Sequence, residues 1–164
     1  MPHKKYDFTC CYLNGFIYII SGKDNSCEVV NFCEKYDVER DQWFLITPVQ
    51  KKRYAASSVG LTNLNKIFLF GGRANNNHHM IQEIEQYDAI KDEWTIVNLR
   101  NASIWNPVEV SATIQINEDQ ILVFGGSDVR VRDSAACYFL NVTDNSLERI
   151  TDLKKAQVFV SPAF

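Results

Sequence analysis

The residues that could do chemistry are few and scattered along this chain. His78 and His79 lie in an asparagine-rich segment with no third ligand nearby in the sequence, so we expect a solvated loop rather than a metal site. Cys27 and Cys33 are read as ordinary thiols, with a metal or disulfide role as the alternative. The sequence has no Gly-x-Ser-x-Gly elbow, no His-Glu-x-x-His pair and no Walker-type phosphate loop. We therefore expect no catalytic residue, no bound metal and no cofactor.

Composition narrows the class of protein further. Seventeen Lys and Arg against 20 Asp and Glu give a formal net charge of −3, which argues against a general nucleic-acid binder. The longest apolar runs are strand-sized, far short of the roughly 20 residues that span a membrane. The polar start Met1–Phe8 has no signal-peptide pattern, and five cysteines are odd in number, so we expect a cytoplasmic protein with reduced thiols. Aromatic residues make up 12% of the 164 residues, which favours strands.

An internal repeat of about 50 residues organises the chain. Three apolar runs end in small residues, and the last glycines of these runs are 50 and then 54 residues apart. An aromatic–acidic pair follows each of the first two runs, with Trp seven residues after the aromatic; the third unit has Leu140-Asn141 and Leu147 instead. The landmarks are Gly22, Tyr36, Asp37, Trp43, Gly71, Gly72, Tyr87, Asp88, Trp94, Gly125 and Gly126.

Each unit is predicted to form four strands. In the second unit we expect strands at Tyr54–Leu61, Lys66–Phe70, Met80–Tyr87 and Trp94–Val97. An asparagine-rich turn separates the first two strands, and the glycine pair ends the second. The other two units follow the same scheme.

This pattern resembles the kelch repeat, and the resemblance covers nearly the whole chain. In that family each repeat is one four-stranded blade of a β-propeller, which implies an all-β fold of three antiparallel blades. The expected blades are residues 6–50, 51–101 and 102–152, and residues 153–164 would be the first strand of a further blade. Three blades form only a partial propeller. More of the same polypeptide, a second copy as a homodimer or another chain could complete the ring, and the sequence leaves these alternatives open.

The resemblance also implies a function. Kelch propellers that capture peptides use the loops after the glycine pair and the residues before the innermost strand. The resemblance therefore implies a non-catalytic interaction scaffold that binds protein partners. An acidic peptide is one partner that arginines at these positions would suit. The alternative for the arginine before the innermost strand is a packing role between blades, and the alternative for the loop arginines and asparagines is a solvated position without a ligand. A second alternative is a propeller enzyme of the copper oxidase or sugar mutarotase type, with its catalytic residues outside this chain. The candidate partner-binding residues are Arg53, Arg73, Asn75, Asn76, His78, Ser127, Asp128, Arg130 and Arg132.

Overall fold

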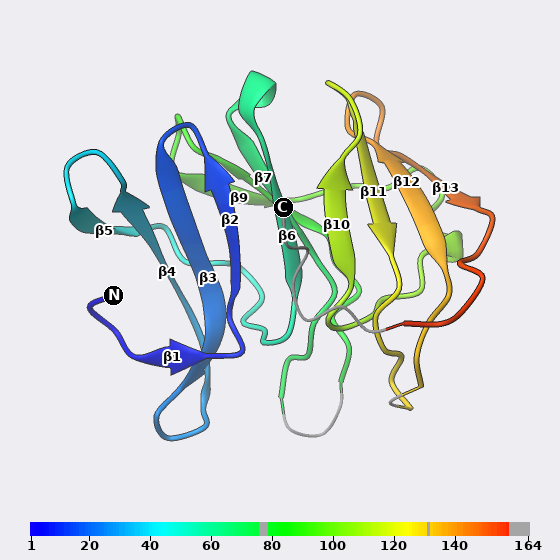
Figure 1. Ribbon diagram of the computed structural model, residues 1–164, viewed down its shortest axis with the longest axis horizontal. Helices are drawn as coiled ribbons and strands as arrows, with labels where there is room; N and C mark the ends of the chain where they lie inside the picture. Colours follow the sequence, from blue (N-terminus) through cyan, green and yellow to red (C-terminus); the bar gives the residue numbers. More distant parts are fainter. Residues whose placement is uncertain (76–78, 131, 158–164) are drawn as a thin grey trace.

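The computed structural model describes residues 1–75, 79–130 and 132–157, and the described strands form three antiparallel sheets (Figure 1). The first sheet is a meander in which β2, β3, β4 and β5 pair in chain order. The short strand β1 pairs with the far end of β3, beyond a register shift between Ile20 and Gly22. The strands of this sheet are β1 (Lys5–Tyr6), β2 (Thr9–Leu13), β3 (Phe16–Asp24), β4 (Val29–Asp37) and β5 (Gln42–Ile46).

The second and third sheets repeat this meander with four strands each. Their strands are β6 (Ser57–Leu61), β7 (Lys66–Phe70), β8 (Glu85–Asp88) and β9 (Glu93–Ile96), then β10 (Ala112–Gln115), β11 (Gln120–Phe124), β12 (Cys137–Asn141) and β13 (Ser146–Ile150). Two single-turn helices, η1 (Thr62–Leu64) and η2 (Ala102–Ile104), lie in connections. The predicted all-β fold of antiparallel blades is therefore confirmed, and we call the three sheets blades 1, 2 and 3.

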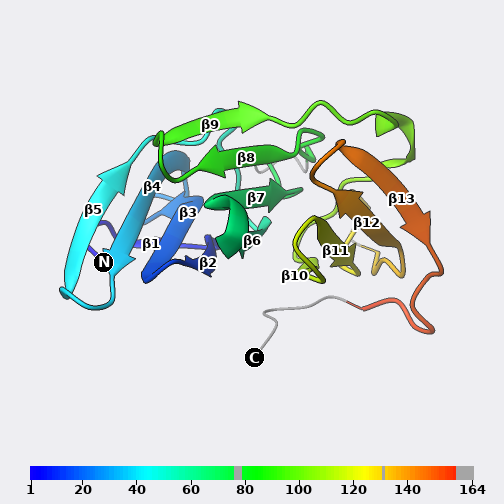
Figure 2. The same cartoon turned by 90° about the horizontal axis from the view of Figure 1, so that it is seen from above.

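The blades stand side by side in an open arc, as a view along their strands shows (Figure 2). The first strands β2, β6 and β10 line the concave side, and the last strands β5, β9 and β13 lie on the outside. This is the arrangement of a partial β-propeller that does not close on itself within the described residues. The predicted blade boundaries near residues 50, 101 and 152 stay predictions.

The repeat landmarks are cross-strand pairs. Tyr36 lies opposite Trp43, and Tyr87 lies opposite Trp94, in each case with ring centroids about 5 Å apart (4.9 and 5.0 Å). Leu140 and Leu147 occupy the same register in blade 3. The spacing of seven residues is thus the length of one hairpin, and the paired side chains share one face of the sheet.

The acidic residue after each aromatic builds the hairpin turn. Asp37 Oδ1 accepts hydrogen bonds from the amides of the residues two and three positions later, both at 3.0 Å. Asp88 and Asn141 make the same two contacts in blades 2 and 3. Aspartate and asparagine suit this position because a short side chain can replace the backbone carbonyl of a turn.

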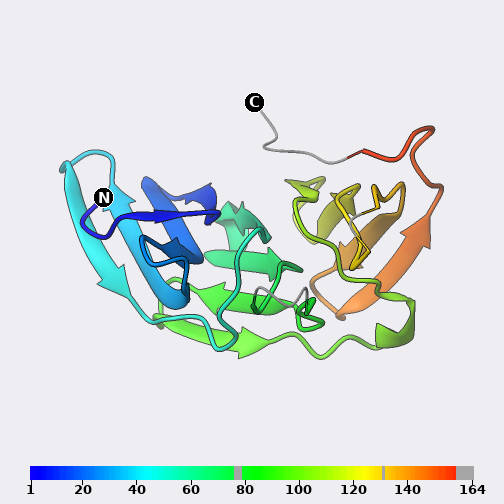
Figure 3. The ribbon, with the colours of Figure 1, turned by 90° about the horizontal axis from the view of Figure 1, so that it is seen from below.

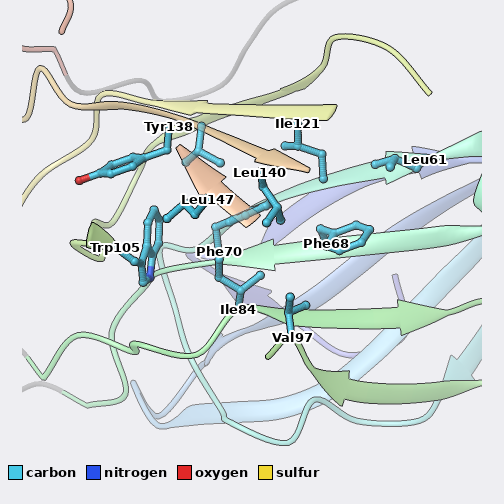
Figure 4. Packing of buried hydrophobic residues seen from close by; sticks show 11 residues of the cluster. Leu61, Phe68, Phe70, Ile84, Val97, Trp105, Ile121, Tyr138, Leu140 and Leu147 are labelled. Atoms are coloured by element: carbon cyan, nitrogen blue, oxygen red, sulfur yellow. The ribbon is translucent and has the colours of Figure 1, made fainter. Parts of the chain in front are cut away.

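The hydrophobic core lies between blades rather than inside one. Leu13, Tyr18 and Ile20 of blade 1 pack against Ile67 and Tyr87 of blade 2. A second cluster joins blade 2 to blade 3 and holds eleven buried residues, ten of which are labelled in Figure 4. In that cluster Phe68, Phe70 and Ile84 extend from blade 2, while Ile121 and Leu140 extend from blade 3. Because apolar burial is the main stabilising contribution, each blade depends on its neighbour for stability.

Two predicted strands in blade 2 are shorter than expected. The third begins at Glu85 rather than Met80, and the first begins at Ser57 rather than Tyr54. Beyond these points Tyr54 and Met80 each form only an isolated bridge to Arg73. The reason is the glycine pair, which ends β7 at Phe70 and leaves the extended neighbours without a continuous ladder.

Candidate functional site

The loops after the small-residue pairs gather at one end of the blades, which we call the loop face. In Figure 1 this is the lower end, where the β3–β4, β7–β8 and β11–β12 connections project, and Figure 3 looks toward it from below. The segments that lead into blades 2 and 3, before β6 and β10, run past the same end. The sequence-predicted binding residues that the structure describes belong to these segments.

Gly71 and Gly72 hold the blades close together at the loop face. Both have positive φ values, +57° and +83°, which glycine adopts without strain. A Cβ on Gly71 would lie 1.8 Å from the carbonyl oxygen of Val108 in the next blade, and the Gly72 amide donates to that same oxygen at 3.0 Å. In blade 1, Ser21 takes the first position, and its hydroxyl donates to the Arg53 carbonyl at 2.6 Å. The pair therefore sets the spacing from which the loops project.

Arg53 is buried inside the molecule rather than exposed on the loop face. Its exposed fraction is 0%, and its guanidinium forms an ion pair with Glu85, which is also fully buried. It also donates to the carbonyl oxygens of Lys51, Gly71 and Glu83 at 3.0–3.1 Å. Burial lowers the pKa of Arg53, and the neighbouring Glu85 charge opposes that shift. The arginine thus ties the segment before β6 to β8 and to the glycine pair.

Arg73 performs a similar structural task between two blades. Its guanidinium forms a two-pronged ion pair with Glu109, which precedes β10 in blade 3. Its side chain is only 4% exposed. A binding role for Arg53 and Arg73 stays a prediction. The contacts give Arg53 the packing role that was its alternative, and they place Arg73 in an inter-blade ion pair rather than in solvent.

A related charge pair occurs in blade 1. Lys5 Nζ lies 3.4 Å from Glu34 Oε2, and both side chains are buried. Burial lowers the pKa of Lys5, and the nearby Glu34 charge opposes that shift. The buried glutamates were missed at the level of sequence, although a signal was present: Glu34-Lys35-Tyr36-Asp37 repeats as Glu85-Gln86-Tyr87-Asp88.

Blade 3 has lost both members of this pair. At the place of Arg53 it has Val108, and at the place of Glu85 it has Tyr138; both are buried. Losing the cation and the anion together leaves no unpaired charge in the interior. The same structural position is therefore filled by an ion pair in blades 1 and 2 and by uncharged side chains in blade 3.

The remaining predicted residues divide between exposed and buried positions. Asn75 and Arg130 are exposed, whereas Ser127 is buried. Asp128 accepts hydrogen bonds from the Arg132 guanidinium at 2.6 and 2.9 Å, and this contact lowers the pKa of Asp128 to about 2. Asn76 and His78 lie outside the described residues.

A hollow of about 430 Å³ opens on the loop face between blades 1 and 2. Its lining residues are Cys27, Glu28, Val29, Gln50, Lys51, Lys52, Ala74, Asn75 and Ile81. Lys51 lies 3.5 Å from Glu83, with both side chains partly exposed, and Lys52 is exposed as well. Among the described residues, Asn75 is the one sequence-predicted residue that lines this hollow, beside Lys51 and Lys52, which the sequence also placed before the inner strand.

A larger hollow of about 800 Å³ follows the concave side of the arc along β2, β6 and β10. Hydroxyl groups there join successive blades: Thr9 to Ser58 at 2.8 Å, and Ser57 to the carbonyl of Ser111 at 2.6 Å. Within the described ranges, no three His, Cys, Asp or Glu residues are placed together to hold a metal ion. In the same part of the chain, no helix is long and apolar enough to span a membrane.

The sequence is similar to those of several known proteins. No family model matches the sequence. Kelch-like protein 26 of Danio rerio is 30% identical over 132 residues, which are 77% of this chain and 20% of that protein. Kelch-like protein 25 of Xenopus laevis is 22% identical over 79% of this chain and 22% of its own length. The chain belongs to the kelch-repeat family. Kelch-like protein 9 of Mus musculus adds 40% identity over a shorter stretch of 63 residues, 38% of this kelch chain and 10% of that protein.

The solved structure of YjhT shows the same fold at the level of the backbone. It matches with a TM-score of 0.76 at 12% identity, over 94% of this chain and 54% of that chain. The kelch chain spans about a tenth to a fifth of the curated relatives named above and about half of YjhT. The likeness supports the propeller fold.

Proposed function

We propose that this kelch chain is a non-catalytic interaction scaffold that binds a protein partner through its loop face. Several relatives carry names of Kelch-like proteins, and the three blades place variable loops on a rigid support. The observation that carries the proposal is the hollow between blades 1 and 2, because it is bounded by loops and by two exposed lysines. The propeller-enzyme alternative stays a prediction.

The partner chemistry that we propose is an acidic peptide segment. Lys51 and Lys52 stand at the rim of the hollow, and Arg130 and Arg132 are exposed on the loop of blade 3. Lys51 and Arg132 contact Glu83 and Asp128, but both side chains stay exposed and can reach a ligand. These cations are carried by a protein whose net charge is −3, so a local positive surface would steer an acidic segment to this end. Arg53 and Arg73 would act through the scaffold, because their charges are already paired inside it.

A peptide selection tests the proposal without a known partner. A library of displayed random peptides is selected on the whole chain, and affinity for the enriched peptides is then measured for the wild type and for Lys51→Glu with Lys52→Glu. We expect Asp- and Glu-rich peptides, with affinity lost at least tenfold in the double variant, about 1.4 kcal/mol. Lys91→Glu is the matched control, since Lys91 is an exposed lysine in the β8–β9 turn at the opposite end.

Two results would count against the proposed function. One is enrichment of peptides with no acidic residues. The other is equal affinity of the wild type and the lysine double variant for every enriched peptide. A loss caused by Lys91→Glu of the same size would show a general charge effect instead of a loop-face site.

A further inference from the structure

The contact between blades 1 and 2 and the contact between blades 2 and 3 share a backbone pattern. The Ala55 amide donates to the Asp7 carbonyl at 2.8 Å, and the Val110 amide donates to the Ala55 carbonyl at 2.9 Å. All three residues have φ values between +51° and +53°. These residues mark equivalent positions in blades 1, 2 and 3, and each amide reaches back to the blade before. Asp7 would make the corresponding contact with a blade that precedes blade 1.

In both of these contacts, a cationic side chain of one blade lies against a residue of the blade that follows it. Lys23, directly after Gly22, lies with its Nζ 3.6 Å from the ring centroid of Tyr54. Arg73, directly after Gly72, forms its ion pair with Glu109. Tyr54 and Glu109 are equivalent positions, because each makes a backbone bridge to the residue after its own glycine pair. In blade 1 the equivalent of Tyr54 is Tyr6, which pairs with Lys23 in the same way.

The leading face of blade 1 is defined by Tyr6, Ile17, Tyr36 and Trp43, and no blade of the described residues lies against it. Ile17 is 36% exposed, whereas the equivalent Ile67 of blade 2 is 0% exposed. Tyr6 is 41% exposed, whereas Tyr54 is 9% exposed. Tyr36 and Trp43 are partly exposed, although their equivalents in blade 2 are buried. The face therefore has the residues of an inter-blade contact and lacks only the blade.

Blade 3 of a second copy does not fit this face, because the chain's own tail lies in the way. Gly22 and Gly72 donate their amides to Arg53 and Val108, the residues that lead into the next blade. The equivalent Gly126 donates to Gln157 of the same chain at 2.8 Å. A second copy would have to bring its Lys5 to the place that Gln157 occupies.

The tail follows the ordinary path from one blade to the next. The Leu153 amide donates to the Ala135 carbonyl at 2.8 Å, as the Val49 amide donates to the Asn31 carbonyl at 3.1 Å. Blade 3 also has Ser127, and no cation, after its glycine pair. Both features argue against a self-closed ring of two copies.

We propose that the leading face of blade 1 docks a blade from a different kelch-repeat segment, one that carries Lys or Arg directly after its glycine pair. The apolar side chains Ile17, Tyr36 and Trp43 would pack on the trailing face of that blade. Its cation would lie over the Tyr6 ring, as Lys23 lies over Tyr54. The docked blade is thus distinguished by a cation directly after its glycine pair, which blade 3 of this chain lacks.

The test adds such a blade to the whole chain. Residues 51–101, which contain Arg73 after the glycine pair, are duplicated ahead of Met1. Eight residues, 98–101 and 1–4, then join Val97 of the added copy to Lys5. That length lies between the six residues from Ile46 to Arg53 and the ten from Val97 to Val108. The added trailing face already packs on a leading face in the native chain, that of blade 3.

Hydroxyl-radical footprinting reads the result, because it resolves the oxidation of individual side chains. The added copy carries Trp94→Phe, so that each remaining tryptophan is unique. We expect oxidation of Trp43 to fall to the level of the native Trp94. Two further variants of this extended chain test the contact: Ile17→Asp should restore Trp43 oxidation, and Arg73→Ser in the added copy, which imitates Ser127, should protect Trp43 less.

Three results would overturn the proposal. The first is Trp43 oxidised as fast in the extended chain as in the original one. The second is an added segment that stays unfolded by circular dichroism, since the face would then have failed to bind it. The third is equal protection by the Arg73→Ser copy, which would remove the selectivity for a cation.

Discussion

The buried Arg53–Glu85 pair offers the sharpest test of how the loop face is supported. We expect Arg53→Met to reduce the free energy of unfolding by about 3–5 kcal/mol, because Glu85 is left as a buried carboxylate without its cation. Among the described residues, the amides of Gln50 and Lys51, at 2.9 and 3.1 Å, would still donate to it. Glu85→Gln should cost a similar amount, because the arginine charge is then unpaired in the interior. Either loss is a large part of the 5–15 kcal/mol typical of a domain.

The double variant separates pairing from simple packing. With both charges removed, the remaining cost is the loss of the guanidinium contacts to three carbonyl oxygens, about 0.5–1.5 kcal/mol for each contact. We therefore expect the Arg53→Met, Glu85→Gln protein to be no less stable than either single variant. Blade 3 supports this expectation, since Val108 and Tyr138 fill the equivalent places without charge.

Urea unfolding of the four proteins, followed by circular dichroism, measures the cycle. The exposed pair Lys51–Glu83 is the control, and Lys51→Met with Glu83→Gln should cost less than about 1 kcal/mol. Single-variant losses below about 1 kcal/mol, or a double variant whose loss equals the sum of the two single losses, would refute the reasoning.

Two further predictions concern the glycine pair and the loop of blade 3. Gly71→Ala should destabilise the protein by about 3 kcal/mol or more in urea unfolding, because its Cβ would collide with the Val108 carbonyl. Gly15→Ala, at φ +88° but in open space, should cost only about 1–2 kcal/mol, and equal losses would contradict the close-approach argument. In a carboxyl NMR titration Asp128 should have its midpoint near pH 2, because the Arg132 guanidinium stabilises the carboxylate. Since this pKa is depressed, the contact should be complete above pH 4 and lost as the pH falls through 2. Arg132→Ala should raise the midpoint, and an unchanged midpoint would contradict the contact.

The regular parts of the fold were predictable because they depend on local patterns. The apolar run Lys66–Phe70 matches β7 residue for residue, since a continuous buried strand ended by glycines has few alternatives. The third unit was also predictable, because Leu140 and Leu147 keep the spacing of a hairpin. The predicted first residues of two strands in blade 2, Tyr54 and Met80, were wrong. Alternation of apolar and polar residues indicates an extended chain, but it does not show whether a neighbouring strand pairs with that chain.

The loop-face arginines were harder to place from the sequence. Charge predicts exposure for an isolated arginine, and Arg53 stands beside two lysines that are in fact exposed. Its burial depends on Glu85, which lies 32 residues away and reaches it only when β8 folds beside the segment before β6. Such pairings are properties of the tertiary structure. The repeated Glu two residues before the Tyr of each Tyr-Asp pair is a trace that they leave in the sequence.

The mass of the chain in solution is the most direct measurement of the open three-blade arc. Light scattering of the purified chain should give the mass of one copy, 18.9 kDa, because the tail around Gln157 occupies the place that a second copy would need. A stable particle of twice that mass, with Trp43 protected from oxidation, would contradict the open arc. It would show instead that two copies close the propeller.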